Sequence, residues 1–226
     1  MKLDLARRAQ IGQERRARTR SQLIDAANRL ISRQAVELIT IDEVVKEAGV
    51  AKGTFYVHFG DMQALMLAVA DGLIEGFDEL LQPKRASLSD PFARIAFCCA
   101  SFIECAIENP GWASVVGRMT ASYPSVGRLA RERLSQDVND LAAADDDVEP
   151  AIVMEAVVGA LMQVLGAISA NRIDAGQGRS ALEPILRITG AKPARIRRTL
   201  AALEQLMHPG APTREATTED APTQRP

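Results

Sequence analysis

Between Lys52 and His58 the sequence places side chains of the types that contact phosphate groups and base edges in a nucleic-acid groove. Lys52 stands at a predicted helix N-terminus, where the helix dipole and the free N–H groups add to the attraction for anions. Gly53 has no side chain, so a sugar-phosphate strand can approach its backbone closely. Thr54, Tyr56 and His58 add hydroxyl and imidazole groups that form hydrogen bonds. This stretch is the candidate binding surface of the chain.

Two short helices joined by a tight turn are predicted to position these side chains. Thr40-Ile-Asp-Glu43 is a capping box, in which Thr40 and Glu43 satisfy each other's free backbone N–H groups at a helix start. Gly49 suits a helix C-terminus because glycine adopts positive φ without strain. A second helix is expected from about residue 51 to 59. The spacing predicts a helix-turn-helix over residues 40–59, although a helical hairpin without binding function has the same pattern.

A helix before this motif and a longer helix after it complete the predicted N-terminal unit. The apolar face of the first helix is formed by Leu23, Ile24, Ala27, Leu30 and Ile31. Asp61 is the expected N-cap of the longer helix, which runs to about Leu81. Phe55 and Phe59, four residues apart, are expected to anchor the binding helix in the core.

A resemblance to a known family is carried by Thr40, Leu65 and the run Ala48-Gly49-Val50-Ala51-Lys52-Gly53-Thr54-Phe55-Tyr56-Val57-His58-Phe59. These residues resemble the DNA-binding signature of the TetR family of transcriptional regulators, over roughly residues 17–77. The resemblance implies an all-α homodimer, in which an N-terminal three-helix DNA-binding domain is joined by a fourth helix to a C-terminal helical ligand-binding and dimerisation domain. Most members repress transcription on a palindromic operator and release it when a small molecule binds.

The matching positions make up a candidate DNA-binding set, namely Thr40, Lys52, Gly53, Thr54, Tyr56 and His58. Departures from the family pattern put individual contacts in doubt, but not the fold. Ala51 stands where the family often has a hydroxyl residue, and Met62 where it often has a lysine that touches phosphate. Gln63 replaces the usual Glu, and Gln34-Ala35-Val36 replaces the common Gly after the first helix.

Charge is divided unevenly along the chain. The formal net charge of the whole chain is −2, but residues 1–60 hold 11 Lys/Arg against seven Asp/Glu, a net charge of +4, and the remainder is acidic. A basic head on an acidic body indicates that the head meets a polyanion. Arg16 and Arg18, just before the first apolar face, join the candidate DNA contacts. A solvated basic extension of the first helix is an equally good interpretation of this segment.

Domain boundaries follow from composition and from residues that start or stop helices. Residues 1–16 are predicted to be a basic N-terminal arm, 17–77 the DNA-binding domain, 78–208 the effector-binding and dimerisation domain, and 209–226 a disordered tail with four prolines. A break is expected at Pro83–Pro91. Helices are then expected at about 91–109, 111–121, 125–143, 150–172, 180–189 and 193–207. Ser180-Ala-Leu-Glu183 has the pattern of a second capping box.

The apolar helix over residues 150–172 has two distinct faces. Its bulky side is expected to fill the core of the subunit. The small-residue side is the candidate dimer interface, formed by Ile152, Ala156, Gly159, Gln163, Gly166 and Ala170. Packing against another helix of the same subunit is the alternative, and a membrane-spanning role is disfavoured by Glu155 and Gln163. Residues 180–189 are expected to contribute to the same interface.

An apolar effector pocket is predicted in the C-terminal domain, lined by Phe102, Trp112, Met119, Tyr123, Met154 and Met162. Each of these side chains also fits an ordinary core position. Few charges interrupt these segments, so an uncharged or amphipathic effector is expected. Cys98, Cys99 and Cys105 lie too close together in the sequence for a disulfide framework and fit a reducing cytosol. Thiol sensing through them is a minor alternative.

The sequence therefore predicts a cytoplasmic, ligand-responsive transcriptional regulator, most simply a repressor, that pairs as a homodimer on double-stranded DNA. No Gly-rich phosphate loop, nucleophile elbow or His–carboxylate spacing is present in the sequence, so neither an enzyme, a cofactor nor a metal site is expected. A helical small-molecule carrier or an enzyme without specific DNA binding is the alternative class. Specific DNA binding separates the two.

Overall fold

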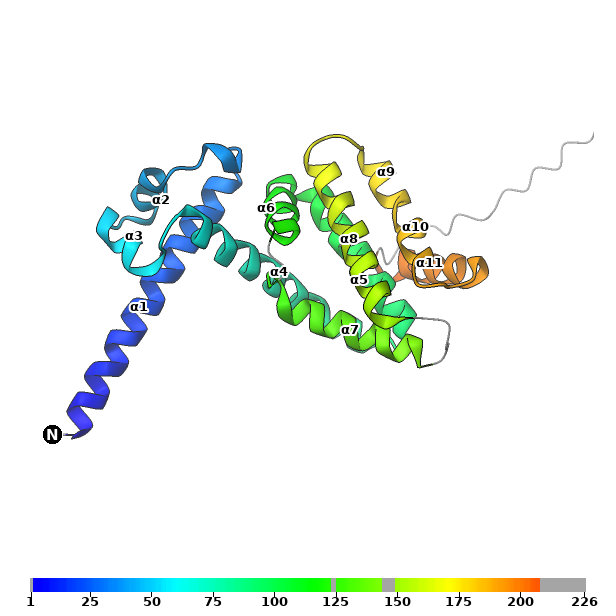
Figure 1. The fold of residues 1–226 in the computed structure, drawn as a ribbon, viewed down its shortest axis with the longest axis horizontal. Coiled ribbons are helices and arrows are strands. Elements are labelled where there is room, and N and C mark those ends of the chain that lie inside the picture. The colour runs from blue at the N-terminus through cyan, green and yellow to red at the C-terminus, as the bar shows by residue number, and fades with distance from the viewer. Residues whose placement is uncertain (1, 123–124, 144–148, 208–226) are drawn as a thin grey trace, which may run out of the picture.

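The computed structural model describes residues 2–122, 125–143 and 149–207, and the elements in these ranges are all helical. Three α-helices and a short 3-10 helix form an N-terminal unit beside a larger helical body (Figure 1). The unit consists of α1 (Lys2–Ile31), a short 3-10 helix η1 (Val36–Leu38), α2 (Ile41–Ala48) and α3 (Lys52–His58). This arrangement confirms the predicted all-α class with an N-terminal helix-turn-helix.

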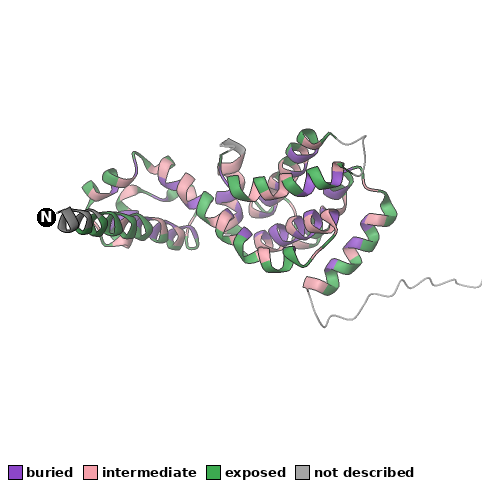
Figure 2. Cartoon of the chain, turned by 90° about the horizontal axis from the view of Figure 1, so that it is seen from below, coloured by how far each residue is buried: buried purple, intermediate pink, exposed green. Residues whose placement is uncertain are grey.

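A single long helix, α4 (Met62–Ala86), leads from the N-terminal unit into the body (Figure 1). The body comprises α5 (Pro91–Glu108), α6 (Pro110–Ser122), α7 (Arg128–Ala142), α8 (Pro150–Ser169), α9 (Ala175–Ser180), α10 (Leu182–Arg187) and α11 (Pro193–Met207). Helix α5 lies at its centre and packs against α4 and α6–α11. The purple buried residues accordingly line the inner faces of the body helices, and the outer faces are green (Figure 2).

Local signals fix the two ends of α2. The Thr40 side chain accepts a hydrogen bond from the Glu43 backbone N–H at 3.3 Å, and the Glu43 carboxylate accepts one from the Thr40 backbone N–H at 2.9 Å. Gly49 follows the helix at φ +68°, a left-handed conformation that costs glycine little. The predicted capping box and C-terminal glycine are therefore both confirmed, and together they set the angle between α2 and α3.

The core of the N-terminal unit is built from the predicted apolar face of α1 and from residues of the helix-turn-helix. Leu23, Val44, Phe55 and Leu65 are each fully buried. Phe55 and Phe59 pack with their ring centroids 5.9 Å apart, so α3 is held by two aromatic side chains on its inner side.

The N-terminal unit also touches the body through α6. The Arg118 guanidinium on α6 pairs with the Glu37 carboxylate on η1. Gly111, near the start of α6, lies so close to the end of α1 that an added Cβ would be 2.9 Å from the Ile31 carbonyl oxygen. The unit is therefore joined to the body at two places, through the continuous α4 and through this contact.

Several predicted boundaries differ in the structure. Helix α4 continues through Pro83 to Ala86, so the break is confined to the residues before Pro91. Pro83 is exposed, and Arg85 beyond it is anchored to α7, which compensates for the backbone hydrogen bond that proline cannot donate. Residues 2–16 extend α1 as a helix rather than leaving it as a separate arm.

The predicted capping box at Ser180 is wrong. The Ser180 hydroxyl donates to the Gly176 carbonyl oxygen inside α9, and the box is formed instead by Asp174 with Gln177 at the start of α9. Ser180 is the last residue of α9, and Ala181, which precedes α10, has helical φ and ψ, so the chain at Ser180 does not have the extended geometry of an N-cap. The predicted disordered tail over 209–226 lies outside the described residues.

Candidate functional site

Helix α3 presents one open face to solvent. Lys52, Gly53, Tyr56 and Val57, at helical spacing i, i+1, i+4 and i+5, are all exposed, and the Tyr56 and Val57 side chains are 53% and 65% exposed. An added Cβ at Gly53 would meet no atom within 4 Å, so the backbone there is accessible from outside. The face combines a cation, a phenol hydroxyl, bare backbone and an apolar side chain, which suits a groove in nucleic acid.

Lys52 has a partner on the preceding helix. Its Nζ atom lies 2.8 Å from Oδ1 of Asp42 on α2, and both side chains are more than half exposed. The hydrogen bond and charge of Asp42 raise the pKa of Lys52, so this lysine is a permanent cation at neutral pH. An exposed pair of this kind contributes little to stability, and an incoming phosphate can therefore replace the carboxylate.

The other predicted DNA-binding residues of the motif are placed less openly. The Thr40 hydroxyl is exposed but occupied, since it donates to the Glu43 carboxylate at 2.8 Å within the capping box. Thr54 and His58 are half-buried on the flanks of α3. The structure thus brings Lys52, Gly53 and Tyr56 onto one face, and the roles of Thr40, Thr54 and His58 stay predictions.

A second feature, a cavity of about 60 Å³, lies in the body between α4, α5, α7 and α8. Most of its lining is apolar, from Ile74, Cys98, Cys99, Phe102, Val126, Gly127, Ala130, Leu134, Val158, Leu161 and Met162, and the polar lining comes from Asp78, Arg85, Thr120, Arg131 and Arg133. Apolar walls with a few convergent polar groups are typical of small-molecule sites.

The cavity lining differs from the predicted one. Of the six predicted residues, Phe102 and Met162 line it. Trp112 instead lies outside the wall, where its ring is tilted against Phe102 and packs edge-on with Phe77, with centroid distances of 5.7 and 5.6 Å. It borders an open groove between the N-terminal unit and the body. Met154 borders a shallow depression elsewhere, Met119 packs partly buried against the core, and Tyr123 lies outside the described residues. Helix spacing identified the apolar faces but not which of them enclose empty space.

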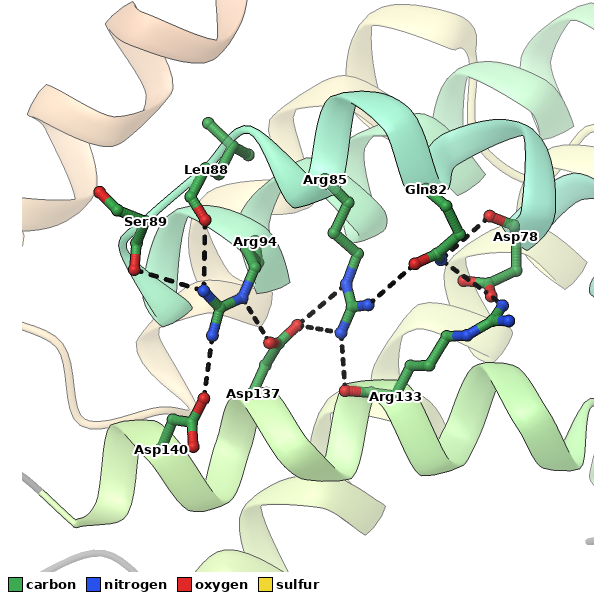
Figure 3. Close-up of polar contacts among 9 residues, drawn as sticks. All are labelled: Asp78, Gln82, Arg85, Leu88, Ser89, Arg94, Arg133, Asp137 and Asp140. Carbon is green, nitrogen blue, oxygen red and sulfur yellow. Dashed lines mark hydrogen bonds and ion pairs between the residues drawn. The ribbon is translucent and has the colours of Figure 1, made fainter.

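Buried charges form one wall of the cavity and join α4 to α7 (Figure 3). The Arg85 guanidinium donates to Asp137 Oδ2 at 2.6 and 3.1 Å and to the Arg133 carbonyl oxygen at 2.7 Å. Arg94 donates to the other oxygen of Asp137 at 2.6 Å, and Arg133 pairs with Asp78. Asp137 thus balances two arginines while only 3% of its side chain is exposed.

Two further carboxylates of α4 cap α7. The N-cap residue of α7, Gly127, has no side chain, and its backbone N–H donates to Asp71 Oδ1 at 2.9 Å. The backbone N–H of Leu129 donates to Glu75 Oε1 at 2.8 Å. The free N–H groups at the start of α7 are thus satisfied by α4, which ties the connecting helix to the cavity wall.

The three cysteines of α5 are held as thiols. Burial raises the pKa of Cys98 to about 12 and that of Cys105 to about 11, and it raises the pKa of Cys99 further. Since the thiolate is the reactive form, these positions are poorly suited to redox sensing or metal binding at neutral pH. No cluster of three or more His, Cys, Asp or Glu that could hold a metal occurs among residues 2–122, 125–143 and 149–207.

Residues 23–69 match the family model of the bacterial regulatory proteins of the tetR family. The match covers the inner face of α1, the whole helix-turn-helix and the start of α4, which are the elements that present α3 to solvent. The similarity to this family lies in these residues, which make up about a fifth of the chain. The match is to a family of regulatory proteins rather than of enzymes, as the sequence predicted.

Curated relatives match the same N-terminal region. TtgR of Pseudomonas putida, an HTH-type transcriptional regulator, is 38% identical over 72 residues, which are 32% of this chain and 33% of TtgR. HbdR of an Aromatoleum species, named likewise, is 28% identical over 90 residues, or 40% of this chain and 38% of HbdR. The matched region spans only about a third of the length of these relatives.

Solved structures match much more of the chain. RolR, crystallised with the ligand resorcinol, covers 83% of this chain and 95% of its own with a TM-score of 0.70 at 23% identity. FadR of Bacillus subtilis, in complex with stearoyl-CoA, covers 74% and 97% with a TM-score of 0.60 at 15% identity. At these identities the likeness shows the fold alone, and it extends over the helical body as well as the N-terminal unit.

The predicted dimer face of α8 is largely open in the single subunit. Ile152 is 67% exposed, and Gly159, Gln163 and Ala170 are exposed, whereas Ala156 is half-buried. Gly166 is half-buried. An added Cβ on Gly117 of α6 would lie 3.6 Å from the Cα atom of Gly166, so Gly166 serves packing within the subunit. Helix α8 is also long and apolar enough to cross a membrane, yet it packs on α5, α6 and α7.

Sequence reasoning missed two residues of the α3 surface. Val57 is exposed beside Tyr56. Its place directly after Tyr56 in the sequence could have indicated that it belongs to the same exposed face of the helix. Asp42 lies on the preceding helix, and its approach to Lys52 depends on the angle between α2 and α3, which spacing alone does not give.

Proposed function

We propose that this protein is a ligand-responsive transcriptional repressor of the TetR family. It binds a palindromic operator as a homodimer, with one α3 helix in each of two major grooves. It releases the operator when a small, largely apolar molecule binds between α4, α5, α7 and α8. A cytoplasmic location follows from this role.

The observation that carries the proposal is the open face of α3. Lys52 and Gly53 stand at its N-terminal end, where an ammonium group and bare backbone favour phosphate, and Tyr56 and Val57 follow one turn later. Phe55 and Phe59 hold the opposite side in the core, so the exposed side chains are presented by a fixed helix. TtgR and HbdR, which share this region, are both named transcriptional regulators, and their names support the same role here.

The cavity supports a small and compact ligand. A volume of about 60 Å³ excludes a long acyl chain and is smaller than the cavity of about 150 Å³ that holds benzene. A compact ring such as the resorcinol found with RolR therefore fits only if the walls move apart. Asp78, Arg133 and Thr120 at the wall are positioned to bind hydroxyl or carbonyl groups of an otherwise apolar molecule.

The cavity is also positioned to influence DNA binding. Asp71, Glu75, Asp78 and Arg85 of α4 all contact α7 or the turn before it, and the cavity opens between these two helices. A ligand that prefers a wider separation of α4 and α7 shifts α4, and with it the distance between the two α3 helices of a dimer. Operator affinity then falls by the ratio of the ligand's affinities for the two states.

A gel shift with the DNA upstream of the protein's own gene tests the proposal. We expect a shift that survives excess random duplex at 200 mM salt, because base contacts add to the salt-sensitive phosphate contacts. A helical carrier or enzyme would give no specific shift. Addition of resorcinol and of other small phenols to the shifted complex then asks whether compact aromatic ligands release it.

A further inference from the structure

The N-terminal half of α1 projects beyond the domain it belongs to. Figure 1 shows the helix running away from α2 and α3, and in Figure 2 the described residues of its projecting part have the green colour of exposed residues. Residues 10–18 are all exposed, and the buried face of the helix begins only at Leu23. At 1.5 Å per residue, the segment 2–18 spans roughly 25 Å. The described side chains of this segment, at residues 7 and 10–18, are all exposed and contribute nothing to the core.

The projecting segment carries arginines on two sides. Arg16 lies one turn before Arg20, on the face of α1 that continues into the core. Arg15 and Arg18 lie on the opposite face, also exposed. Among the described side chains of residues 10–20, Glu14 is the one acidic residue, and its carboxylate accepts a hydrogen bond from Gln10 rather than from an arginine. The segment is therefore a basic rod.

The rod starts beside α3. The Arg20 guanidinium lies 5.0 Å from the centre of the Phe59 ring, at the residue that ends α3. Upstream of this contact the chain leaves the domain, so Arg18, Arg16 and Arg15 follow directly from the edge of the α3 surface. These arginines therefore lie within about five residues of the contact between α1 and the C-terminal end of α3.

We infer that the N-terminal half of α1 is a second DNA-binding element, which contacts the sugar-phosphate backbone beyond the base pairs covered by α3. Arg15, Arg16 and Arg18 are the contact residues. Because Arg15 lies roughly 7.5 Å along the helix from Arg20, they extend the footprint of each subunit by about two base pairs at 3.4 Å per step. The inference rests on the proposed function, since it takes α3 to be the recognition helix.

Duplex DNA fits this surface better than an anionic membrane does. Arginine side chains occupy both faces of the helix, whereas a helix lying in a membrane interface needs one continuous apolar face. Ile11, 42% exposed, shares a face with Arg15 and Arg18 and does not form such a stripe. The position next to α3 further places the segment where a bound duplex supplies phosphates on either side.

The test compares two triple variants of the full-length protein with the wild type. R15A/R16A/R18A removes the proposed contacts, and R197A/R198A/R172A removes three exposed arginines of the body as a control for total charge. The probes are two duplexes from the protein's own upstream region, one covering the whole wild-type hydroxyl-radical footprint and one trimmed to its central half-sites. Alanine favours helix, so the first variant retains its fold.

For the long duplex we expect the first variant to bind at least tenfold more weakly at 150 mM salt. The slope of log K against log salt concentration should become shallower by about 2.7 for each subunit whose N-terminal segment contacts the DNA. The footprint should shorten at its outer edges. On the trimmed duplex it should match the wild type, as the control variant should on both probes.

Unchanged affinity, slope and footprint on the long duplex overturn the inference. A second result also overturns it. If the wild type binds vesicles with 30% anionic lipid, and the triple variant loses this binding but keeps its DNA binding, the partner of the segment is a membrane. If Tyr56→Ala abolishes specific binding in the same assay, the proposed function stands even where this inference fails.

Discussion

The Lys52 ammonium group at the first residue of α3 lies 2.8 Å from the Asp42 carboxylate in the first turn of α2. The candidate phosphate-binding cation is therefore already engaged inside the helix-turn-helix. DNA binding requires the exchange of one anion for another.

Removal of Asp42 should strengthen DNA binding. Asp42→Asn frees Lys52 and takes a negative charge away from the DNA-facing side, so we expect operator affinity to rise about twofold to fivefold, the scale of an exposed ion pair. Fluorescence anisotropy at several salt concentrations measures the operator affinity. Lys52→Ala should weaken binding and lower the salt slope by roughly one per subunit.

The double variant D42N/K52A provides the control. If the gain from Asp42→Asn acts through Lys52, it should largely disappear when Lys52 is absent. An equal gain in both backgrounds would show that Asp42 acts only as a repulsive charge.

The buried carboxylate of Asp137 should be critical for stability. Asp137→Asn leaves Arg85 and Arg94 without their shared anion in the interior, which we expect to lower the free energy of unfolding by about 3 kcal/mol. Asp140, which also pairs with Arg94 but whose side chain is 60% exposed, is the matched control. Asp140→Asn should cost less than about 1 kcal/mol. If urea unfolding shows that the two variants lose equal free energy of unfolding, the burial of Asp137 is contradicted.

The open face of α8 should carry the dimer. An added Cβ at Gly159 meets nothing within 4 Å in the subunit, so Gly159→Leu disturbs only a partner chain. We expect monomers by sedimentation velocity, with helix content unchanged. Gly76→Leu on α4, an equally open glycine, should leave the dimer intact. A wild-type dimer dissociation constant for Gly159→Leu would place the interface elsewhere.

The cysteines should be unreactive at physiological pH. With its pKa raised to about 11, Cys105 has roughly a hundredfold less thiolate at pH 8 than a free cysteine, and Cys98 has less still. Labelling by a disulfide reagent at pH 8 should therefore be slow in the folded protein and fast in urea. Reactivity should increase as pH approaches 11, beginning with Cys105. Rapid labelling of the folded protein at pH 7 would revive the thiol-sensing alternative.

Local features of the N-terminal unit were predictable from the sequence. The Thr40–Glu43 box, the positive φ of Gly49 and the buried pair Phe55 and Phe59 depend on residues close in the chain. Their spacing and side-chain chemistry determine the outcome with little help from tertiary contacts. Proximity also explains why Lys52, Gly53 and Tyr56 were found together.

Features of the body depend on contacts between distant residues. Arg85 and Asp137 are 52 positions apart, so no local pattern shows that they meet, and their contact in turn explains why α4 continues past Pro83. Trp112 follows the expected apolar pattern, but the packing of Phe77 from α4 keeps it outside the cavity. Cavities are the space that remains after packing, which spacing does not encode.

The most direct test of the account is specific DNA binding by Tyr56→Ala. Tyr56 is 53% exposed at the centre of the α3 face and contributes little to the core, so the variant should fold as the wild type does. We predict that its affinity for the protein's own upstream operator falls by roughly 5- to 150-fold, with affinity for random duplex nearly unchanged. Leu80→Ala, at a 77% exposed residue of α4, should bind as the wild type. A folded Tyr56→Ala protein with wild-type operator affinity would contradict the assignment of α3 as the recognition helix.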